Sequence, residues 1–315
     1  MDTQDKATLT WKVRDALRNE DFDLFGIAQA KDCYEESNHI REWISAGRNG
    51  TMHFLERNSD KRADIETLVP GARSVIVAGL QYFGDEAPDD TDDFFVSRYA
   101  RVRDYHEVMK MKLQRVAAII NKEVQGTRCR VFCDSAPLTE KAWAVRAGLG
   151  WRGRNSLIIN ENIGSFFFLG EIVTTAELVH DDHEVHDQCG TCRRCIEACP
   201  TKAICDDRSI DARRCISYLT VEHAGELAEE FRGKMGKMIF GCDRCQEVCP
   251  WNKNASHYLT AELNPLHPVT SLTKNDWLAM TSEQFKTYFR SSPISRTGYQ
   301  KIRQNIKFVA DSSPE

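Results

Sequence analysis

The chain has 315 residues, of which 41% are hydrophobic and 28% are charged, and its formal net charge is −5. These values are typical of a globular protein, and the net charge by itself does not indicate binding to nucleic acid. The first 20 residues are charged throughout and the most apolar runs are far too short to cross a bilayer. We therefore expect a cytoplasmic protein with no secretory signal and no contact with a membrane.

Residues 1–188 alternate helical and strand-like patterns, which predicts a mixed α/β domain. Apolar periodicity predicts helices over 5–19, 36–46, 60–68, 105–124 and from Pro137 to about Ala147. Strands are predicted over 73–80 and 130–133, together with a pair over 156–160 and 165–174 that turns around 162–164. The acidic run 85–93 is typical of a solvated loop.

Composition divides the chain into three expected parts. Residues 1–180 form the α/β domain, 181–255 form a cysteine-rich, turn-rich domain, and 256–315 form a helical, basic segment with short helices near 275–280 and 282–290. The boundary near 180–188 is polar.

Nine of the twelve cysteines fall between residues 189 and 249, and such crowding in a reducing compartment points to metal rather than to disulfides. The first run is Cys189-x2-Cys192-x2-Cys195-x3-Cys199-Pro200, the spacing that holds [4Fe–4S] clusters in two-cluster ferredoxins. A second run, Cys242-x2-Cys245-x3-Cys249-Pro250, lacks its leading cysteine, and Cys215 is the natural replacement.

In two-cluster ferredoxins the fourth cysteine of a run binds the other cluster. That rule assigns one cluster to Cys189, Cys192, Cys195 and Cys249, and the other to Cys199, Cys215, Cys242 and Cys245. Cys205 is left over as a small core residue. The alternative is a pair of four-cysteine zinc sites, because C-x2-C pairs also suit tetrahedral zinc, although zinc does not require the proline-terminated runs.

Two basic stretches are candidates for a nucleic-acid surface. Residues 285–308 carry six Lys or Arg and no acid, interleaved with aromatic residues, and residues 101–130 carry eight basic and three acidic residues. An ordinary surface helix with a packed aromatic side explains the first stretch equally well. The chain has no G-x-G-x-x-G turn after a strand and no P-loop, so no standard nicotinamide site is visible.

The order of several motifs resembles epoxyqueuosine reductase. They are Cys133-Asp134-Ser135-Ala136-Pro137, the glycine-rich stretch 147–155, Gly164-Ser165, Phe168–Glu171 and both cysteine runs. The resemblance implies an α/β (mixed α+β) cobalamin-binding domain, a two-cluster ferredoxin-like domain and a short helical C-terminal segment. It also implies cobalamin, two [4Fe–4S] clusters and a tRNA substrate, whose wobble epoxyqueuosine is reduced to queuosine with two electrons and two protons.

The same resemblance suggests roles for individual residues. Asp134 is the expected proton donor, and a buried environment would raise its pKa enough for it to act near neutral pH. An alternative role for Asp134 is to organise the turn before the next helix. The resemblance places cobalamin contacts at Arg57, Ser97, Asp134, Ile158, Leu169, Ser217, Cys242 and Asp243, and tRNA contacts at His223, Lys301 and Arg303.

Two other functions fit the residues. One is a corrinoid-dependent reductase of a small molecule, similar to reductive dehalogenases, and the other is an iron–sulfur electron-transfer protein with no substrate of its own. For the tRNA-modifying reductase, the expected partners are the anticodon loop and an unidentified low-potential electron donor, and the expected state is a monomer.

Overall fold

The structure is a computed structural model that describes residues 3–83, 93–134, 136–181, 185–253, 255 and 260–311. The predicted acidic loop over 85–93 therefore lies almost wholly outside the described residues. Of the helices that are described, none combines the length and the apolar character that a membrane span needs.

A four-stranded antiparallel sheet is the centre of the larger half of the molecule. Its strand order is β1 (Leu24–Gln29), β2 (Ser74–Gln81), β7 (Phe167–Thr174) and β4 (Cys129–Phe132). Every residue of β2 is buried, because β2 has neighbours on both edges and layers on both faces. This explains why the strand predicted over 73–80 is apolar without alternation.

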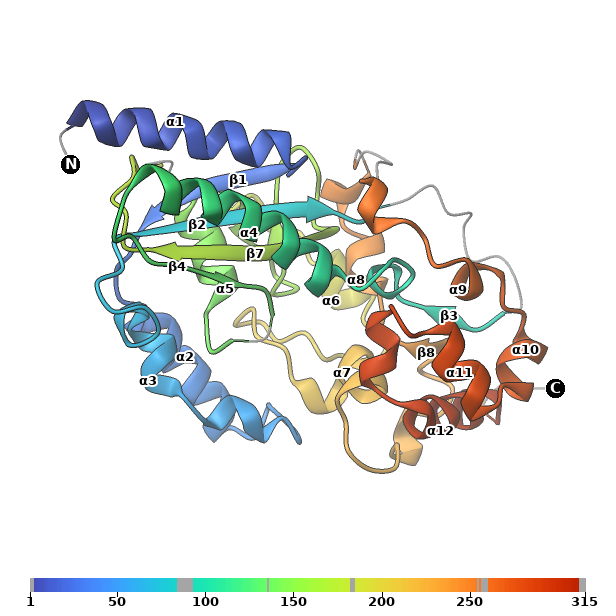
Figure 1. The fold of residues 1–315 in the computed structure, drawn as a ribbon. Helices are drawn as coiled ribbons and strands as arrows, with labels where there is room; N and C mark the ends of the chain where they lie inside the picture. The colour runs from blue at the N-terminus through green and yellow to red at the C-terminus, as the bar shows by residue number, and fades with distance from the viewer. Residues whose placement is uncertain are drawn as a thin grey trace.

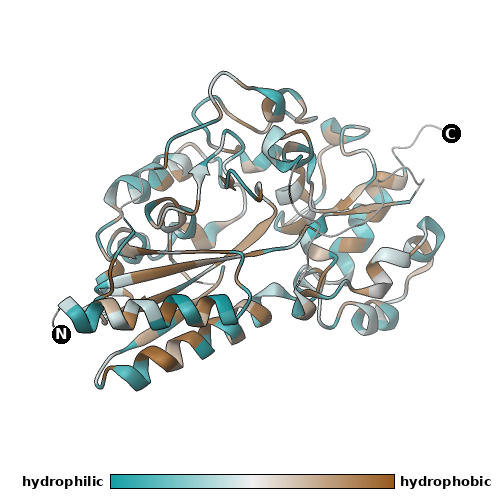
Figure 2. Ribbon diagram, turned by 90° about the horizontal axis from the view of Figure 1, so that it is seen from above, coloured by the Kyte–Doolittle hydropathy of each residue, from teal (hydrophilic) through white to brown (hydrophobic). Residues whose placement is uncertain are grey.

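Helices cover both faces of this sheet (Figure 1). On one face, α1 (Thr3–Asn19) and α4 (Tyr105–Glu123) pack over Ile76 and Phe168. On the other face, α5 (Glu140–Arg146) places Trp143 over Val77. Figure 2 shows the result as hydrophobic strands beneath helices that have one hydrophobic side and one hydrophilic side.

Short helical elements extend this first half. They are α2 (Tyr34–Ser45), α3 (Ser59–Ala63), η1 (His53–Glu56), η2 (Ile65–Thr67) and η3 (Arg98–Ala100). The predicted helices over 5–19, 36–46, 105–124 and 138–147 are thus observed with ends shifted by a few residues, and the helix predicted over 60–68 is α3 followed by η2.

The C-terminal half has its own apolar core around Phe240, Trp277 and Phe289. Strand β3 (Phe95–Val96) pairs in parallel with β8 (Met238–Phe240), so a strand from the first half of the sequence completes this core. The helices of this half are α7 (Ile216–Val221), α9 (His267–Ser271), α10 (Lys274–Ala279), α11 (Ser282–Tyr288) and α12 (Tyr299–Ala310). Its short 3-10 turns are η5 (Glu229–Phe231), η7 (Ala261–Leu263) and η8 (Pro293–Arg296).

The segment between the two cores contains little regular structure. Its elements are α6 (Arg194–Glu197), η4 (Ala212–Arg214), α8 (Arg244–Glu247) and η6 (Pro250–Asn252). Figure 1 shows α6 and α8 beside each other between the sheet and the C-terminal helices.

The predicted pairing of 156–160 with 165–174 is wrong. Strand β6 (Ile158–Ile159) pairs with β5 (Trp151–Arg152), and the bridge between Asn160 and Gly164 joins the first predicted strand to the predicted turn, not to the second strand. The reason is that β7 is taken into the sheet between β2 and β4, which satisfies both of its edges. Asn252 accepts a hydrogen bond from the backbone nitrogen of Ser165 (2.7 Å) and so fixes the chain where it enters β7.

Gly26 allows α5 to lie close against the sheet. A Cβ atom at Gly26 would come 1.9 Å from the carbonyl oxygen of Ala147, the residue that caps α5. We expect Gly26→Ala to lower the free energy of unfolding by about 3 kcal/mol, because a backbone atom has to move. Gly126→Ala is the control: it has open space but φ +78°, so it should cost about 1 kcal/mol. Chemical denaturation measures both, and equal losses would contradict the packing argument.

Candidate functional site

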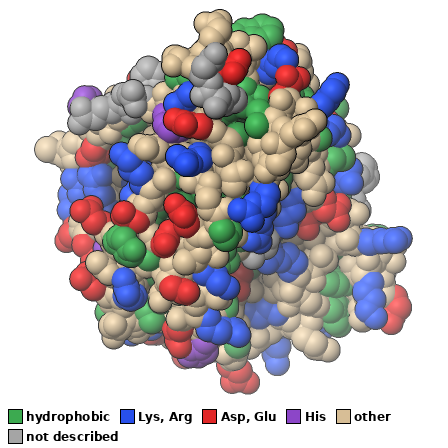
Figure 3. Space-filling model, turned by 60° about the vertical axis from the view of Figure 1, so that its left-hand side comes forward, with side chains coloured by type: hydrophobic (Ala, Val, Ile, Leu, Met, Phe, Trp, Pro, Cys, Tyr) green, Lys and Arg blue, Asp and Glu red, His purple; other side chains and the backbone are tan. Residues whose placement is uncertain are grey.

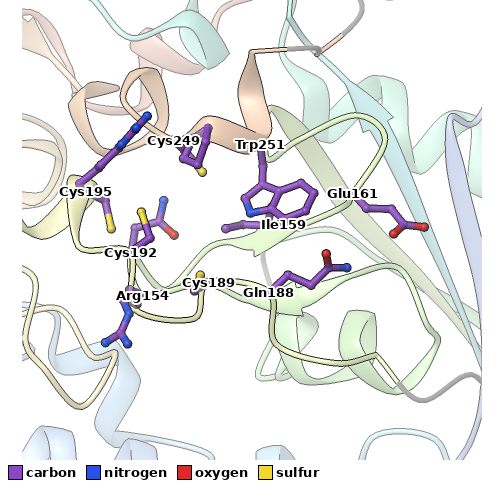
Figure 4. Close-up of a pocket in the computed structure, with 12 residues that line it drawn as sticks. Arg154, Ile159, Glu161, Gln188, Cys189, Cys192, Cys195, Cys249 and Trp251 are labelled. Carbon is purple, nitrogen blue, oxygen red and sulfur yellow. The ribbon is translucent and has the colours of Figure 1, made fainter.

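The first cysteine set surrounds one cavity. Cys189, Cys192, Cys195 and Cys249 line a cavity of about 360 Å³, and Figure 4 shows their sulfur atoms around it with Trp251 at one side. Cys195 lies in the first turn of α6, and Cys249 lies directly before Pro250 and η6. The two segments that supply these cysteines are far apart in sequence and meet because α6 packs against α8.

The second cysteine set lines a different cavity, of about 300 Å³. Its members are Cys199, Cys215, Cys242 and Cys245. The two cavities therefore group the eight cysteines in the same way as the ferredoxin rule does. Cys205 lines neither cavity, and its sulfur lies 3.9 Å from the carbonyl oxygen of Ala203.

The thiols of the second set need positive charge if they are to ionise. Burial raises the pKa of Cys242 to about 12, and burial raises that of Cys245 well above the usual value. Iron supplies that charge in a [4Fe–4S] cluster, so the donor set fits such a cluster. In the part of the chain that the structure describes, no three His, Cys, Asp or Glu side chains converge on the position of a single metal ion.

The second cavity also contains part of the predicted cobalamin site. Ser97, Ser217, Cys242 and Asp243 all line it, together with Tyr99 and Lys141. Asp243 is 2% exposed, and its carboxylate accepts hydrogen bonds from the Ser97 hydroxyl (2.5 Å) and the Arg98 backbone nitrogen (2.8 Å). This pair therefore stabilises the wall beside Cys242. A hollow with hydroxyls, a lysine and cluster thiols at its wall is compatible with a polar-edged macrocycle such as a corrin.

Four predicted cobalamin residues lie outside that cavity lining, and one of them, Asp134, is described in the next paragraph. Arg57 is exposed directly after η1, and Ile158 is buried in the core that faces α5. Leu169 is partly buried against the same core. Their contact with cobalamin stays a prediction.

Asp134 lies at the end of β4 with φ 55°, a conformation that is uncommon for a residue other than glycine. Its side chain is 51% exposed, so a substrate can reach it. The Tyr105 hydroxyl donates a hydrogen bond to its Oδ2 (2.9 Å), and His106 Nε2 lies 3.1 Å from the same atom. Arg296 of η8 places a guanidinium nitrogen 3.8 Å away.

The expected rise in the pKa of Asp134 is wrong for this arrangement. Burial acts to raise the pKa, but the hydrogen bonds from His106 and Tyr105 and the charges of His106 and Arg296 outweigh it, so the pKa lies below its usual value. Burial acts to lower the pKa of His106, yet Asp104 and Asp134 raise it overall. His106 Nε2 lies between Oδ2 of Asp134 (3.1 Å) and a guanidinium nitrogen of Arg296 (2.8 Å), so one ring nitrogen contacts both groups.

Two further carboxyl groups lie behind Asp134, and the sequence reasoning assigned no role to either. Glu140 accepts a hydrogen bond from the backbone nitrogen of Asp134 (2.5 Å), and burial together with the charge of Asp134 raises the pKa of Glu140 to about 7. Glu171 on β7 is completely buried. An acid inside the apolar run 166–173 is a signal in the sequence that could have identified Glu171.

The three side chains predicted to contact tRNA differ in their burial and in the hydrogen bonds that they make within the protein. His223 places Nε2 3.1 Å from the carbonyl oxygen of Glu226, and Arg303 donates to the carbonyl oxygen of Leu278 (2.6 Å) while remaining exposed. Lys301 differs from the expectation, because its amino nitrogen is buried and burial lowers its pKa to about 8. The Lys301 amine therefore does not face solvent, where a phosphate contact requires it.

Charge is unevenly distributed on the surface shown in Figure 3. Acidic and basic side chains are mixed on the left half of that view, whereas Lys and Arg predominate on the right half. Such a distribution allows a local basic surface on a protein whose net charge is −5.

Comparisons with known proteins match nearly the whole chain. A family model described as 4Fe-4S double cluster binding domain matches residues 188–252, and one described as Epoxyqueuosine reductase QueG, DUF1730 matches residues 62–135. The epoxyqueuosine reductase of Cellulophaga algicola is 41% identical over 90% of this chain and 92% of its own length.

Two solved structures are similar over 96% of this chain. An epoxyqueuosine reductase solved with an epoxyqueuosine-modified tRNA-Tyr stem loop has a TM-score of 0.89 and 29% identity, with 80% of that chain covered. The Bacillus subtilis enzyme has a TM-score of 0.88 and 28% identity, with 81% covered. It is described with its aspartate-bearing catalytic loop swung out of the active site.

Two cysteine substitutions test the cluster assignment. We expect Cys215→Ala to reduce the iron content from about eight to about four atoms per chain, because it removes a ligand of one [4Fe–4S] cluster. Cys205→Ala should keep about eight, since Cys205 lines neither cavity. Metal and sulfide analysis of anaerobically purified protein measures this, and zinc without iron would contradict the assignment.

Proposed function

This chain belongs to the epoxyqueuosine reductase family, and we propose that it reduces epoxyqueuosine at the wobble position of tRNA to queuosine, with cobalamin beside the second cysteine set and Asp134 as the proton donor. The single observation that carries the proposal is that the suggested cobalamin hollow and Asp134 lie close to each other. Glu140 accepts a hydrogen bond from the backbone nitrogen of Asp134, and the next residue, Lys141, lines the hollow beside the second cysteine set.

The family match confirms the predicted iron–sulfur oxidoreductase and its double [4Fe–4S] domain. It favours the tRNA-modifying reductase over a small-molecule reductase and over a pure electron carrier. Removing the epoxide oxygen as water takes two electrons and two protons and leaves a carbon–carbon double bond. Bound cobalamin would supply a strongly reducing, nucleophilic cobalt centre for this reaction.

The two cysteine sets define an electron route through this chain. The set of Cys189 is near the surface, since Gln188 and Arg194 beside it are exposed, so it is the entry point for an external donor. The set of Cys215 shares its cavity with the proposed cobalamin wall, so it is the exit. The identity of the low-potential donor, the monomeric state and the cytoplasmic location remain predictions.

Asp134 would deliver a proton to the epoxide oxygen. Its half-exposed carboxyl is open to a substrate, and His106 Nε2 lies 3.1 Å from its Oδ2. Asp104 accepts from the other ring nitrogen, Nδ1 (2.6 Å), and thereby orients the ring. The swung-out loop of the Bacillus subtilis relative supports an aspartate loop that opens and closes.

Binding of tRNA would use exposed cations around this opening. Arg296 is 56% exposed and lies in the basic 285–308 segment, so it can contact a phosphate and Asp134 from the same position. The flipped wobble base would then enter above the hollow, because chemistry on a base requires it to leave the stack. The relative solved with a modified stem loop supports an anticodon stem loop as the substrate.

A defined assay tests this function. Protein reconstituted with both clusters and cobalamin, reduced by a viologen, should convert epoxyqueuosine to queuosine in an anticodon stem loop, as detected by mass spectrometry. We expect Asp134→Asn to lower kcat by about 100-fold or more, because it removes the proton donor. The exposed control Asp60→Asn should keep wild-type turnover. Full turnover by Asp134→Asn would refute its role.

The hydrogen bond from Tyr105 gives a prediction with a definite sign. Tyr105 stabilises the ionised form of Asp134, so Tyr105→Phe should raise the pKa of Asp134. A proton donor acts below its pKa, and therefore the alkaline limb of the kcat profile should move to higher pH by about one unit. Tyr34→Phe, at an exposed tyrosine, should leave the profile unchanged. A shift to lower pH would contradict the assignment.

A further inference from the structure

Arg62 on α3 is a buried cation. It is 8% exposed, and no described residue forms a hydrogen bond or an ion pair with its guanidinium. Burial lowers the pKa of Arg62, and the charge of Asp60 offsets only part of this effect. An arginine nevertheless stays protonated, and a buried charge is costly unless an acceptor compensates it. The guanidinium therefore needs an acceptor that the described part of the chain does not supply.

Arg62 lines a cavity of about 240 Å³ between α2, η1 and α3. Figure 1 shows α2 and α3 beside each other, below the sheet. Among the described side-chain atoms that are both sealed from solvent and unpaired, none belongs to Arg62, so its guanidinium reaches the open space of the cavity. Arg41, Ser45 and Ser59 line the same cavity. Two guanidinium groups and two hydroxyls are thus available to one ligand.

This lining is suited to a phosphate group. A guanidinium matches the oxygens of a phosphate with two parallel hydrogen bonds, and hydroxyls can donate to a further oxygen. The volume is below the usual range for pockets that hold drug-sized ligands, so it fits a single group. Glu56 also lines the cavity, but its Oε1 lies 2.8 Å from His53 Nδ1 and 3.4 Å from Asn49 Nδ2, and neither of these residues lines it. The negative charge of Glu56 is therefore engaged by groups outside the lining.

A hydrogen bond connects the wall of this cavity to the wall of the hollow beside the second cysteine set. Element η1, one wall of the cavity, begins two residues after Thr51. The Thr51 backbone nitrogen donates to the Tyr218 hydroxyl of α7 (2.6 Å), and α7 begins with Ile216 and Ser217, which line the hollow. The cavity therefore lies on the side of the hollow that α7 forms.

Element η1 also carries an exposed aromatic side chain beside an exposed cation. Phe54 is 51% exposed, and Arg57 directly follows η1 and is exposed as well. An aromatic ring next to a cation is typical of surfaces that bind unpaired bases of RNA, because the ring stacks on a base and the cation attracts the backbone. This surface favours RNA as the source of the phosphate.

Resting on the proposed function, we propose that the cavity between α2, η1 and α3 binds a backbone phosphate of the substrate RNA outside the flipped wobble nucleotide, with Arg62 as the buried cation that receives it. The phosphate supplies the negative charge that Arg62 lacks in the free protein. This contact carries no base specificity; it holds the anticodon loop in place while the wobble base enters the hollow.

Affinity and stability of the cluster-containing protein together test the role of Arg62. We expect Arg62→Met to raise the Kd for an anticodon stem loop about tenfold and to reduce the slope of log Kd against log salt by about 0.7, because one phosphate contact is lost. Since Met removes an uncompensated charge, the denaturation midpoint without RNA should rise. Arg73→Met, at an exposed arginine at the end of the sheet opposite to Asp134, should change neither. A lower midpoint or an unchanged Kd for Arg62→Met would overturn the proposal.

Neutral methylphosphonates, placed one at a time in the stem loop, locate the phosphate. At one position outside the wobble nucleotide, the substitution should weaken binding by the wild type about tenfold and leave binding by Arg62→Met unchanged, as a double-mutant cycle requires for a shared contact. Arg41→Gln, at an exposed side chain, should raise the Kd about threefold without changing the core. If no position couples to Arg62, while millimolar inorganic phosphate raises the midpoint of the wild type but not that of Arg62→Met, the cavity takes free phosphate and the RNA proposal is overturned.

The same measurements separate this proposal from the proposed function, because binding needs no turnover. Coupling at one phosphate, without reduction of the modified stem loop by fully reconstituted protein, would refute the proposed function and support the phosphate site. Reduction without coupling at any phosphate would refute the phosphate site alone.

Discussion

Burial of negative charge is the constraint on which this structure depends. Eight cysteine thiols line the two cavities, and three carboxyl groups lie close to the sheet: Asp134 after β4, Glu140 at the start of α5 and Glu171 on β7. Each group needs positive charge, a proton or water to be stable there. Iron meets that need for the thiols, and His106, Tyr105 and Arg296 meet it for Asp134. Burial raises the pKa of Glu171 well above its usual value and that of Glu140 to about 7, so Glu171 keeps its proton and Glu140 titrates near neutral pH. The thiols and the carboxyl groups are thus stabilised by different means in one protein interior.

Different parts of the antiparallel sheet carry these carboxyl groups. Strand β4 ends at the loop that carries Asp134, and the face of β7 that α5 covers carries Glu171. Helix α5 connects the two, since it begins with Glu140 and Lys141, beside the loop and the hollow respectively. A shift of α5 would therefore disturb the carboxyl groups and the wall of the hollow together.

The sequence alone predicted the chemistry better than the topology. The spacing of the cysteine runs predicted a grouping that the two cavities reproduce, because local spacing dictates which thiols a turn can bring together. The long helices were also visible as periodic patterns. The pairing of β5 with β6 and the insertion of β7 between β2 and β4 were not, since strand order depends on contacts between distant segments. The pKa of Asp134 was mispredicted for the same reason: hydrogen bonds from His106 and Tyr105 on α4 lower it, and Arg296 adds its charge from 162 positions along the chain.

The pairing of β3 with β8 affects how the protein reaches its native state. Phe95 of β3 pairs with Met238 of β8. Strand β3 is synthesised early and cannot pair until β8 has left the ribosome, which happens after most of the cysteines have been made. Such long-range closure gives a high contact order and slow formation of the second core. Five of the eight assigned cluster cysteines lie inside that closing loop, and Cys242, Cys245 and Cys249 follow β8 directly. Cluster insertion and completion of this core are therefore linked steps of maturation, and iron starvation should leave the newly made chain open to proteases at the same junction.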